Sequence, residues 1–345
     1  MMRLLNVTLV KGTIALGVGL MSANSSSAAD LELGLPIVCK LGEDCFVQNY
    51  VDIDPGSEVQ TATCFRAGYD GHKGTDFRVL DTAETADVVA SAPGVVRGVR
   101  DEMPDRLVVS EQDRQRVADK ECGNGVVIAH GGGWETQYCH LRQGSLAVSG
   151  GDRVERGQKL GQVGYSGFAA FPHVHLSVRK DGKTVDPFLG SFDQAGPRLT
   201  RCNEGTSETL SYDQPLWQGD IEPLLADAEG TIIQSGFADG PVKSLDLEQG
   251  LASQPESRSP ALVFFARLIN LQKGDRVTLR VEGPEGILAE SEGEPVERQK
   301  AQWVAFAGRK LRSATWPAGD YTGTVTLVRN GEVFRQKTSR FALDG

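Results

Sequence analysis

The chain has 345 residues, 39% of them hydrophobic, and a formal net charge of -10 at pH 7. This acidic balance disfavours nucleic acid as a partner and gives no overall attraction to an anionic polymer. The length exceeds the needs of one small catalytic unit, so we expect a second hydrophobic core.

The first 29 residues have the pattern of a secretory signal peptide. Arg3 and Lys11 precede an apolar stretch at residues 12–21, and small residues follow up to Ala29. This apolar stretch is shorter than the run of about 20 residues that spans a bilayer, and no second such run follows. We therefore predict cleavage near Ala29, a periplasmic or secreted product and no stable membrane anchor.

Six cysteines in an exported chain predict disulfides, because oxidising compartments favour them. Thiolate zinc ligands are the rival interpretation, but the sequence has no closely spaced Cys-x-x-Cys pair. Sequence alone does not choose between the possible pairings. Our preferred pairing is Cys39 with Cys45, Cys122 with Cys139, and Cys64 with Cys202.

Four of the five histidines lie in three short motifs, which contain His72 and Asp76, then His140, then His173 and His175. A catalytic zinc takes three nitrogen or oxygen ligands from the protein and leaves a position for water. His72, Asp76 and one histidine of the last pair would supply that set. His173 and His175 share a face if their segment is a strand. Glycines at 71 and 74 disfavour a helical zinc motif, so we expect a site on a loop or strand end.

Together the motifs resemble those of the lysostaphin-type zinc metallopeptidases, which are peptidoglycan endopeptidases with the pattern His-x-x-x-Asp, Tyr-x-His-Leu and His-x-His. The likeness runs from about residue 69 to residue 187 and includes the connecting text at 122–131 and 151–167. It implies one zinc ion per chain, bound by His72, Asp76 and His175. It also implies that His140 and His173 are the catalytic imidazoles.

The same resemblance implies a mostly antiparallel β-sheet core of the duplicated hybrid motif type, acting on peptidoglycan peptides. Hairpin signals at residues 131–133 and at Asp181-Gly182 agree with such a fold. His130 ends an apolar strand and is interpreted as structural. Tyr138 shares a face with His140 if the strand is regular, but an aromatic residue on a half-buried strand is usually packing.

We divide the chain into a signal peptide at 1–29, an N-terminal segment at 30–67 that packs on the core, a metallopeptidase domain at 68–202 and a C-terminal domain at 203–345. The charged residues 101–121 resemble an insertion that forms a short helix or mobile rim beside the groove.

The C-terminal region alternates apolar and polar residues in short runs, at 261–271, 276–281, 302–306 and 321–328. Such runs, with turns between them and a hairpin at Asn330-Gly331, predict an immunoglobulin-like β-sandwich. Its role stays open between a module that binds the wall or a protein partner and a structural cap, because a fold does not fix function.

Three other functions are compatible with parts of the sequence. A non-catalytic relative that regulates another wall hydrolase would be expected to lose ligands, whereas this chain keeps them. Two histidines and a carboxylate also suit non-haem iron in an oxygenase, although the extra histidines and the export signal argue against it. The residues at 154–161 resemble a turn of biotinyl or lipoyl carriers, but no carrier signature surrounds a hairpin-tip lysine.

Overall fold

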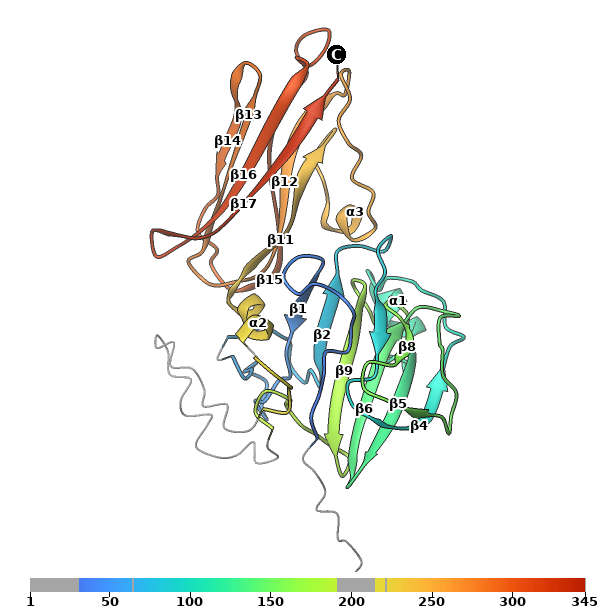
Figure 1. The fold of residues 1–345 in the computed structure, drawn as a ribbon. Coiled ribbons are helices and arrows are strands. Elements are labelled where there is room, and N and C mark those ends of the chain that lie inside the picture. The colour runs from blue at the N-terminus through green and yellow to red at the C-terminus, as the bar shows by residue number, and fades with distance from the viewer. Residues whose placement is uncertain (1–30, 64, 191–214, 221, 345) are drawn as a thin grey trace, which may run out of the picture.

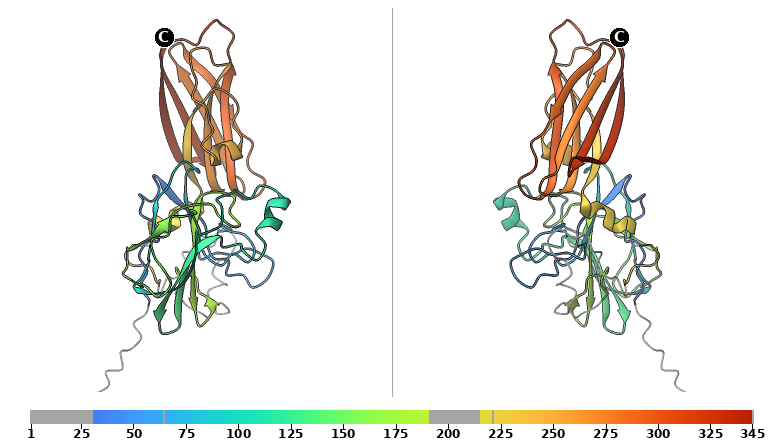
Figure 2. Two further views of the ribbon diagram at one scale, coloured as in Figure 1. Left: turned by 90° about the vertical axis from the view of Figure 1, so that its right-hand side faces the viewer. Right: turned by 90° about the vertical axis from the view of Figure 1, so that its left-hand side faces the viewer.

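The structure is a computed structural model that describes residues 31–63, 65–190, 215–220 and 222–344. Two groups of β-sheets follow each other along the chain, and the second group lies at one end of the first (Figures 1 and 2). The expected signal peptide lies outside the described residues. None of the helices in the described part of the chain is long and apolar enough to cross a membrane.

The first group is built on a sheet with the strand order β1-β2-β9-β6-β5-β4-β7, in which β10 also pairs with β9. A separate two-stranded sheet joins β3 to β8. All these pairings are antiparallel, which confirms the expected mostly antiparallel core. The strands are β1 Cys45–Asn49, β2 Thr75–Val79, β3 Asp87–Val89, β4 Gly94–Arg100, β5 Asn124–Gly131, β6 Trp134–Leu141, β7 Arg153–Val154, β8 Lys159–Gln162, β9 His173–Lys180 and β10 Lys183–Thr184.

Strand β9 shows why this sheet has a buried face and a functional face. Val174, Leu176 and Val178 are at most 1% exposed and belong to the main hydrophobic cluster. Each buried aliphatic side chain of this kind contributes about 1.5–3 kcal/mol to folding. Because side chains alternate along a strand, His173 and His175 lie on the opposite face.

Glycines in the left-handed region close the two hairpins expected in this sheet. Gly133, between β5 and β6, has φ 82°, and a Cβ atom there would lie 2.0 Å from the Asp181 carboxylate. Asp181 and Gly182, between β9 and β10, have φ 49° and 78°. A side chain is strained in this region, so both turns depend on glycine.

The N-terminal segment contributes a strand to the main sheet, since β1 pairs with β2 along Cys45 to Asn49. The charged stretch at 101–121 contains the short helix α1 Glu111–Arg116. Ser110 begins this helix, and its side chain accepts a hydrogen bond from the Asp113 amide. No residue of α1 is buried, so the helix stands on the surface.

The second group consists of a three-stranded sheet, β11-β12-β15, and a four-stranded sheet, β14-β13-β16-β17. Both sheets contribute to one hydrophobic cluster, which contains Leu262 and Phe264 from β12 and Val281 and Val325 from the other sheet. This arrangement is the expected β-sandwich. The strands are β11 Thr231–Ala238, β12 Ala261–Leu271, β13 Arg276–Gly283, β14 Gly286–Glu292, β15 Lys300–Lys310, β16 Gly319–Arg329 and β17 Glu332–Leu343.

The two groups meet through short helices and a small apolar cluster. Figure 1 shows α2 Glu222–Leu225 and α3 Ser244–Glu248 at this junction, and the 3-10 turn η2 Ala226–Glu229 follows α2. Phe46 from β1 packs with Ile233 and Ile269 from the sandwich. All three side chains are completely buried, so the junction has a core of its own.

Two disulfides join Cys39 to Cys45 and Cys122 to Cys139, as the sequence analysis predicted. Cys64 and Cys202 lie outside the described residues, so their predicted pairing stays a prediction.

Candidate active site

Three potential metal-ligand atoms converge where β2 meets β9. His72 Nε2 lies 3.2 Å from Asp76 Oδ1 and 3.2 Å from His175 Nδ1, and the last two atoms are 2.8 Å apart. In a tetrahedral zinc site with bonds of about 2.0–2.1 Å, the ligand atoms lie roughly 3.3 Å from one another. The spacing and the chemistry of these donors therefore fit one zinc-sized ion.

The pairing of β2 with β9 positions this cluster. Asp76 and His175 are direct partners in the ladder, so their side chains leave the sheet side by side. His72 approaches from the loop before β2, as expected for a site at a strand end. A Cβ atom on Gly74 would lie 2.5 Å from the His175 ring, so glycine allows the loop to pass this close.

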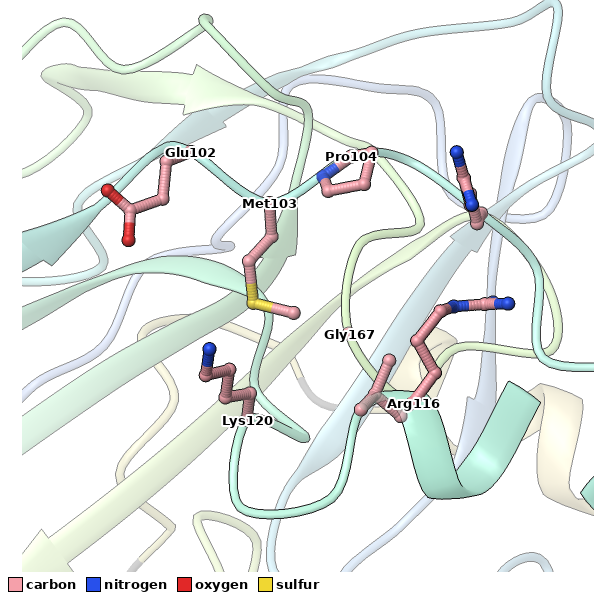
Figure 3. Close-up of a pocket in the computed structure, with 8 residues that line it drawn as sticks. Glu102, Met103, Pro104, Arg116, Lys120 and Gly167 are labelled. Atoms are coloured by element: carbon pink, nitrogen blue, oxygen red, sulfur yellow. The ribbon is translucent and has the colours of Figure 1, made fainter. Parts of the chain in front are cut away.

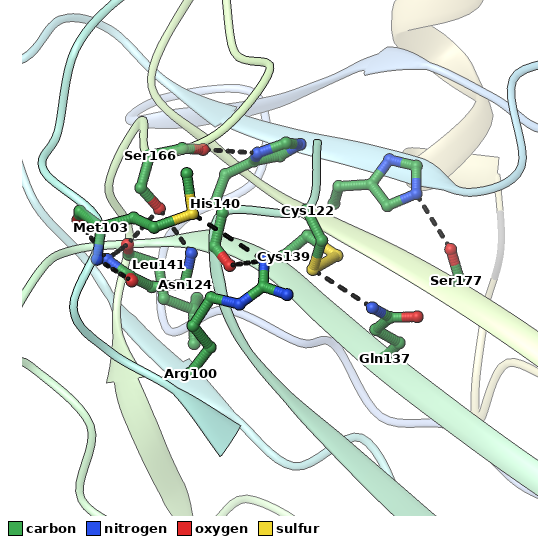
Figure 4. The surroundings of a disulfide bond; sticks show 12 residues. Arg100, Met103, Cys122, Asn124, Gln137, Cys139, His140, Leu141, Ser166 and Ser177 are labelled. Atoms are coloured by element: carbon green, nitrogen blue, oxygen red, sulfur yellow. Dashed lines mark hydrogen bonds between the residues drawn. A yellow bond between two sulfur atoms is a disulfide. The ribbon is translucent and has the colours of Figure 1, made fainter. Parts of the chain in front are cut away.

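Each of the three side chains is held by a contact to its other polar atom. His72 Nδ1 donates a hydrogen bond of 2.7 Å to the Tyr50 carbonyl, and Asn49 Nδ2 donates one of 2.7 Å to Asp76 Oδ2. His175 Nε2 lies 2.9 Å from Ser177 Oγ (Figure 4). Such outer contacts fix the orientation of metal ligands and leave the remaining atom free to bind.

Two further imidazoles stand beside this cluster. His140 Nδ1 donates a hydrogen bond of 2.8 Å to the Ser166 carbonyl (Figure 4), and His173 Nδ1 donates one of 2.8 Å to the Phe171 carbonyl. The two ring centroids are 4.6 Å apart, and His173 Nε2 is 3.6 Å from Asp76 Oδ1. Since Nδ1 carries the proton in each ring, Nε2 has a free lone pair in the neutral form.

His140 occupies an irregular point of β6. Its φ is 64°, which is rare for a residue with a side chain, and its amide donates a hydrogen bond of 2.8 Å to the Cys122 carbonyl. The regular alternation considered for this strand is therefore wrong at His140. Tyr138 is completely buried, and its hydroxyl accepts a hydrogen bond from the Ser91 amide, so it packs in the core, as preferred.

Burial and neighbouring charges set the protonation of the site. Burial would raise the pKa of Asp76, but the nearby His72 and His173 hold it well below its usual value. Burial lowers the pKa of His140 well below the usual range and also lowers the pKa of His173. Near neutral pH the Asp76 carboxylate is thus ionised, as binding of a cation requires. The imidazoles of His140 and His173 are neutral, as acceptance of a proton requires.

Sequence reasoning missed the residues that orient the site. Asn49 had been assigned only to a packing segment, and nothing in its spacing links it to Asp76, 27 positions later. The link arises because β1 pairs with β2 and brings Asn49 opposite Asp76. Ser166 and Phe171 act through backbone carbonyls, which leave no trace in residue type.

The fifth histidine lies outside the cluster. His130 Nδ1 is 2.7 Å from the Pro93 carbonyl and its Nε2 is 2.7 Å from Thr136 Oγ1, so both nitrogens are engaged in structural contacts. This agrees with the structural interpretation of His130. Cys39, Asp44 and Cys45 also lie close together, but the two sulfurs form a disulfide.

A small cavity of about 280 Å³ adjoins the 101–121 stretch (Figure 3). Met103 and Val117 give it an apolar part, while Arg116 and Lys120 add positive charge. Gly167 lines this cavity and follows Ser166 in the chain, and the Ser166 carbonyl accepts the hydrogen bond from His140 Nδ1. The cavity is therefore adjacent to the candidate active site. Whether the 101–121 stretch controls access to the site stays a prediction.

Comparison with known proteins identifies the class of this fold and site. Residues 70–187 match the family model described as peptidase family M23. The chain thus contains an M23 peptidase domain, which confirms the family expected from the three histidine motifs.

Several named proteins resemble this domain. The peptidoglycan DD-endopeptidase ShyA of Vibrio cholerae is 36% identical over 73 residues, which are 21% of this chain and 16% of that protein. The DD-carboxypeptidase/endopeptidase Mpg of Neisseria meningitidis is 37% identical over 82 residues, which are 24% of this chain and 18% of that protein. The match thus spans less than a fifth of each relative.

Among solved structures, the catalytic domain of the antimicrobial peptidase lysostaphin from Staphylococcus simulans has 21% identity and a TM-score of 0.26. The superposition covers 40% of this chain and 85% of that domain.

Proposed function

We propose that this chain is an exported zinc metalloendopeptidase that hydrolyses peptide bonds of peptidoglycan, in the periplasm or after secretion. The observation that carries the proposal is the cluster of His72, Asp76 and His175, whose three donor atoms lie 2.8–3.2 Å apart beside two unligated imidazoles. The substrate class rests on the relatives named as endopeptidases, two of which carry peptidoglycan in their names.

In this proposal His72 Nε2, Asp76 Oδ1 and His175 Nδ1 would hold one zinc ion. A zinc ion with three protein ligands lowers the pKa of a bound water toward neutrality and polarises a substrate carbonyl. The contacts from Tyr50 and Asn49 keep the ligand atoms in position, so less reorganisation accompanies binding.

The two remaining imidazoles handle protons and developing charge. His140 Nε2 accepts the proton that the attacking water loses and returns it to the departing amine. His173 Nε2 lies 3.6 Å from Asp76 Oδ1 and is unprotonated in the neutral ring, so it would donate to the oxygen that becomes negative only after it takes a proton from solvent water. Both roles need rings that change protonation easily and are held by Nδ1, as the backbone carbonyls of Ser166 and Phe171 do here.

Separate measurements of metal content and turnover test these roles. We expect purified protein to contain about one zinc ion per chain and to lose cleavage of cross-linked muropeptides when a chelator is added. His72→Ala should lose both metal and cleavage. His140→Ala should keep the metal while cleavage falls about 10²–10⁴-fold, the usual contribution of a general acid–base.

His130→Asn is the matched control, because His130 is the one histidine outside the site and should affect neither quantity. An undiminished cleavage rate in His140→Ala would show that the roles are assigned wrongly. If the wild-type chain holds no metal, cleaves nothing and binds a wall amidase tightly, it is a regulator instead of an enzyme.

A further inference from the structure

A groove of about 1020 Å³ opens beside the candidate metal site, and we refer to it as the Tyr69 groove. One wall comes from the end of the N-terminal segment and the start of the peptidase domain and includes Phe65 and Tyr69, and the other comes from the sandwich and includes Lys273 and Arg298. The Tyr69 ring centroid lies 4.6 Å from that of His72. The groove therefore lies between the two sheet groups, and Tyr69 on its wall neighbours a proposed metal ligand.

Hydrogen bonds fix both walls of this groove. Behind the wall that contains Phe65 and Tyr69, the Tyr50 amide donates to the Ala67 carbonyl at 2.8 Å, and the Asp52 amide donates to the His72 carbonyl at 2.8 Å. On the wall that the sandwich provides, Gln302 Nε2 donates to Glu248 Oε1 at 2.9 Å. A preformed groove of this size suits an extended ligand, because little order has to be gained on binding.

The charge of the groove differs from that of the whole chain. The chain carries a net charge of -10, yet the residues that line the groove include four cations and two acids. Arg66 is neutralised by Glu58 at 3.0 Å, and the Lys300 ammonium stands over the Trp303 ring, whereas Lys273 and Arg298 have neither an ion pair nor a ring contact within the described residues. Both side chains are exposed, so their charges face the space of the groove.

We propose that the Tyr69 groove binds an acidic part of the substrate peptide next to the bond that is cut. Free carboxylates of the peptide pair with Lys273 and Arg298, while its aliphatic groups contact Phe65 and Tyr69. This inference rests on the proposed function and names the chemistry that the same site recognises. It also gives the sandwich a direct part in substrate binding.

Location and charge favour a peptide over other acidic ligands. Tyr69 lines the groove and its ring packs against that of His72, so a peptide held in the groove lies beside the proposed metal ligands. Nucleic acid would meet a chain with a net charge of -10, and two unpaired cations do not make a phosphate-binding surface.

Charge reversal in the full-length protein tests this proposal. Lys273→Glu combined with Arg298→Glu should raise KM for a cross-linked muropeptide dimer about tenfold and leave kcat within about twofold, because a pair of exposed ion pairs is worth about 1.4 kcal/mol. The control is Lys310→Glu combined with Arg312→Glu, which changes the net charge equally outside the groove. It should leave KM unchanged.

The same dimer with its carboxylates amidated provides the second arm. Wild-type protein should bind the amidated dimer about as weakly as the double variant binds the acidic one, and the double variant should bind both alike. Binding of a fluorescent dimer in the presence of a chelator gives this result independently of cleavage. Charge-dependent binding without any cleavage would overturn the proposed peptidase activity and would still support binding of the acidic peptide in the Tyr69 groove. Equal KM values for wild type and for Lys273→Glu combined with Arg298→Glu would overturn the proposal that this groove binds the substrate peptide.

Discussion

Asn49 holds the oxygen of Asp76 that points away from the other two ligand atoms. Its amide donates to Asp76 Oδ2 at 2.7 Å, and both side chains are buried. A ligand carboxylate without this bond can rotate, and a buried oxygen without a partner is costly. Residues of this kind explain why three correct ligand types are not by themselves a metal site.

We expect Asn49→Ala to lower zinc affinity about 10–100-fold, because it removes the contact that orients Asp76. Competition with a zinc chelator of known affinity measures this change. Gln60→Ala serves as the comparison, since Gln60 lies in the same segment and its hydrogen bonds run through its backbone to Asp52 and Ile53 and not to the site. Equal zinc affinities for the two variants would mean that Asn49 does not orient the ligand.

Asp186 is a buried acid outside the proposed active site. Its Oδ1 accepts hydrogen bonds from the Phe188 and Leu189 amides, and Oδ2 has no partner among the described residues. Burial raises its pKa to about 7 despite these hydrogen bonds. The folded chain therefore holds a proton between about pH 4 and pH 7 that the unfolded chain releases.

This difference makes stability fall as the pH rises through that window, since unfolding releases the proton. Asp186→Asn cannot ionise, so it should gain on the order of 4 kcal/mol relative to wild type between pH 4 and pH 8, at about 1.4 kcal/mol per pKa unit over about three units. Urea unfolding at the two pH values measures the change. Asp320 is exposed, so Asp320→Asn should lose as much unfolding free energy between pH 4 and pH 8 as wild type. The same loss in Asp186→Asn would contradict the prediction.

At the scale of elements, the irregular end of β6 positions His140. The Cys122–Cys139 disulfide spans 17 residues and stands immediately before His140, whose amide bonds the Cys122 carbonyl. Figure 4 shows the disulfide, His140 and Ser166 together. The bridge thus closes a hairpin at the point where the backbone leaves its regular course.

Replacing both Cys122 and Cys139 with serine should destabilise the fold by about 3 kcal/mol, the value expected for a loop of this length, and should also lower kcat. Thermal unfolding and muropeptide cleavage provide the two readouts. The control replaces Cys39 and Cys45, which close a loop of only 6 residues and lie outside the histidine cluster. This control should lose less stability and keep kcat, and a matching loss of kcat would argue against a positioning role for the bridge.

At the scale of the whole molecule, a buried ion cluster joins the sandwich to the peptidase sheet. Glu248 Oε2 lies 2.7 Å from Arg78 and Oε1 lies 3.1 Å from Arg267, and both arginines are fully buried. The Arg78 guanidinium also stands 4.8 Å from the centre of the Phe171 ring. Phe171 in turn packs against His173 and accepts its Nδ1 hydrogen bond.

We expect Glu248→Gln to cost about 3–5 kcal/mol, because it leaves two buried cations without a counter-charge. Through Arg78 and Phe171 it should also lower kcat. Asn270→Ala removes hydrogen bonds at the same junction, to Gln48 and Asp227, without touching Arg78. Asn270→Ala should therefore lose stability and keep kcat. If Glu248→Gln and Asn270→Ala lose kcat to the same extent, the loss of kcat comes from destabilisation of the whole junction and not from the contact between Arg78 and Phe171.

The sequence by itself indicated the family of the domain at residues 70–187, the antiparallel sheets and two of the disulfides, and it also supplied the five side chains that we propose for the site. It could do so because strands show a period of two, tight turns need glycine, and the side chains proposed to bind metal stand in compact motifs. The strands β11 and β14 and the helix α3 were not predicted, and β17 was predicted only as the second strand of the hairpin at Asn330-Gly331. A helix of five residues is too short to show a helical period.

Only the tertiary structure decided how these parts meet. The pairing of β1 with β2 made Asn49 a partner of Asp76, and the left-handed backbone at His140 took this residue out of the alternation that buries Tyr138. The junction brought Glu248 to Arg78 across 170 positions of the chain. Such contacts depend on register and on packing between distant segments, and no local pattern of residues encodes them.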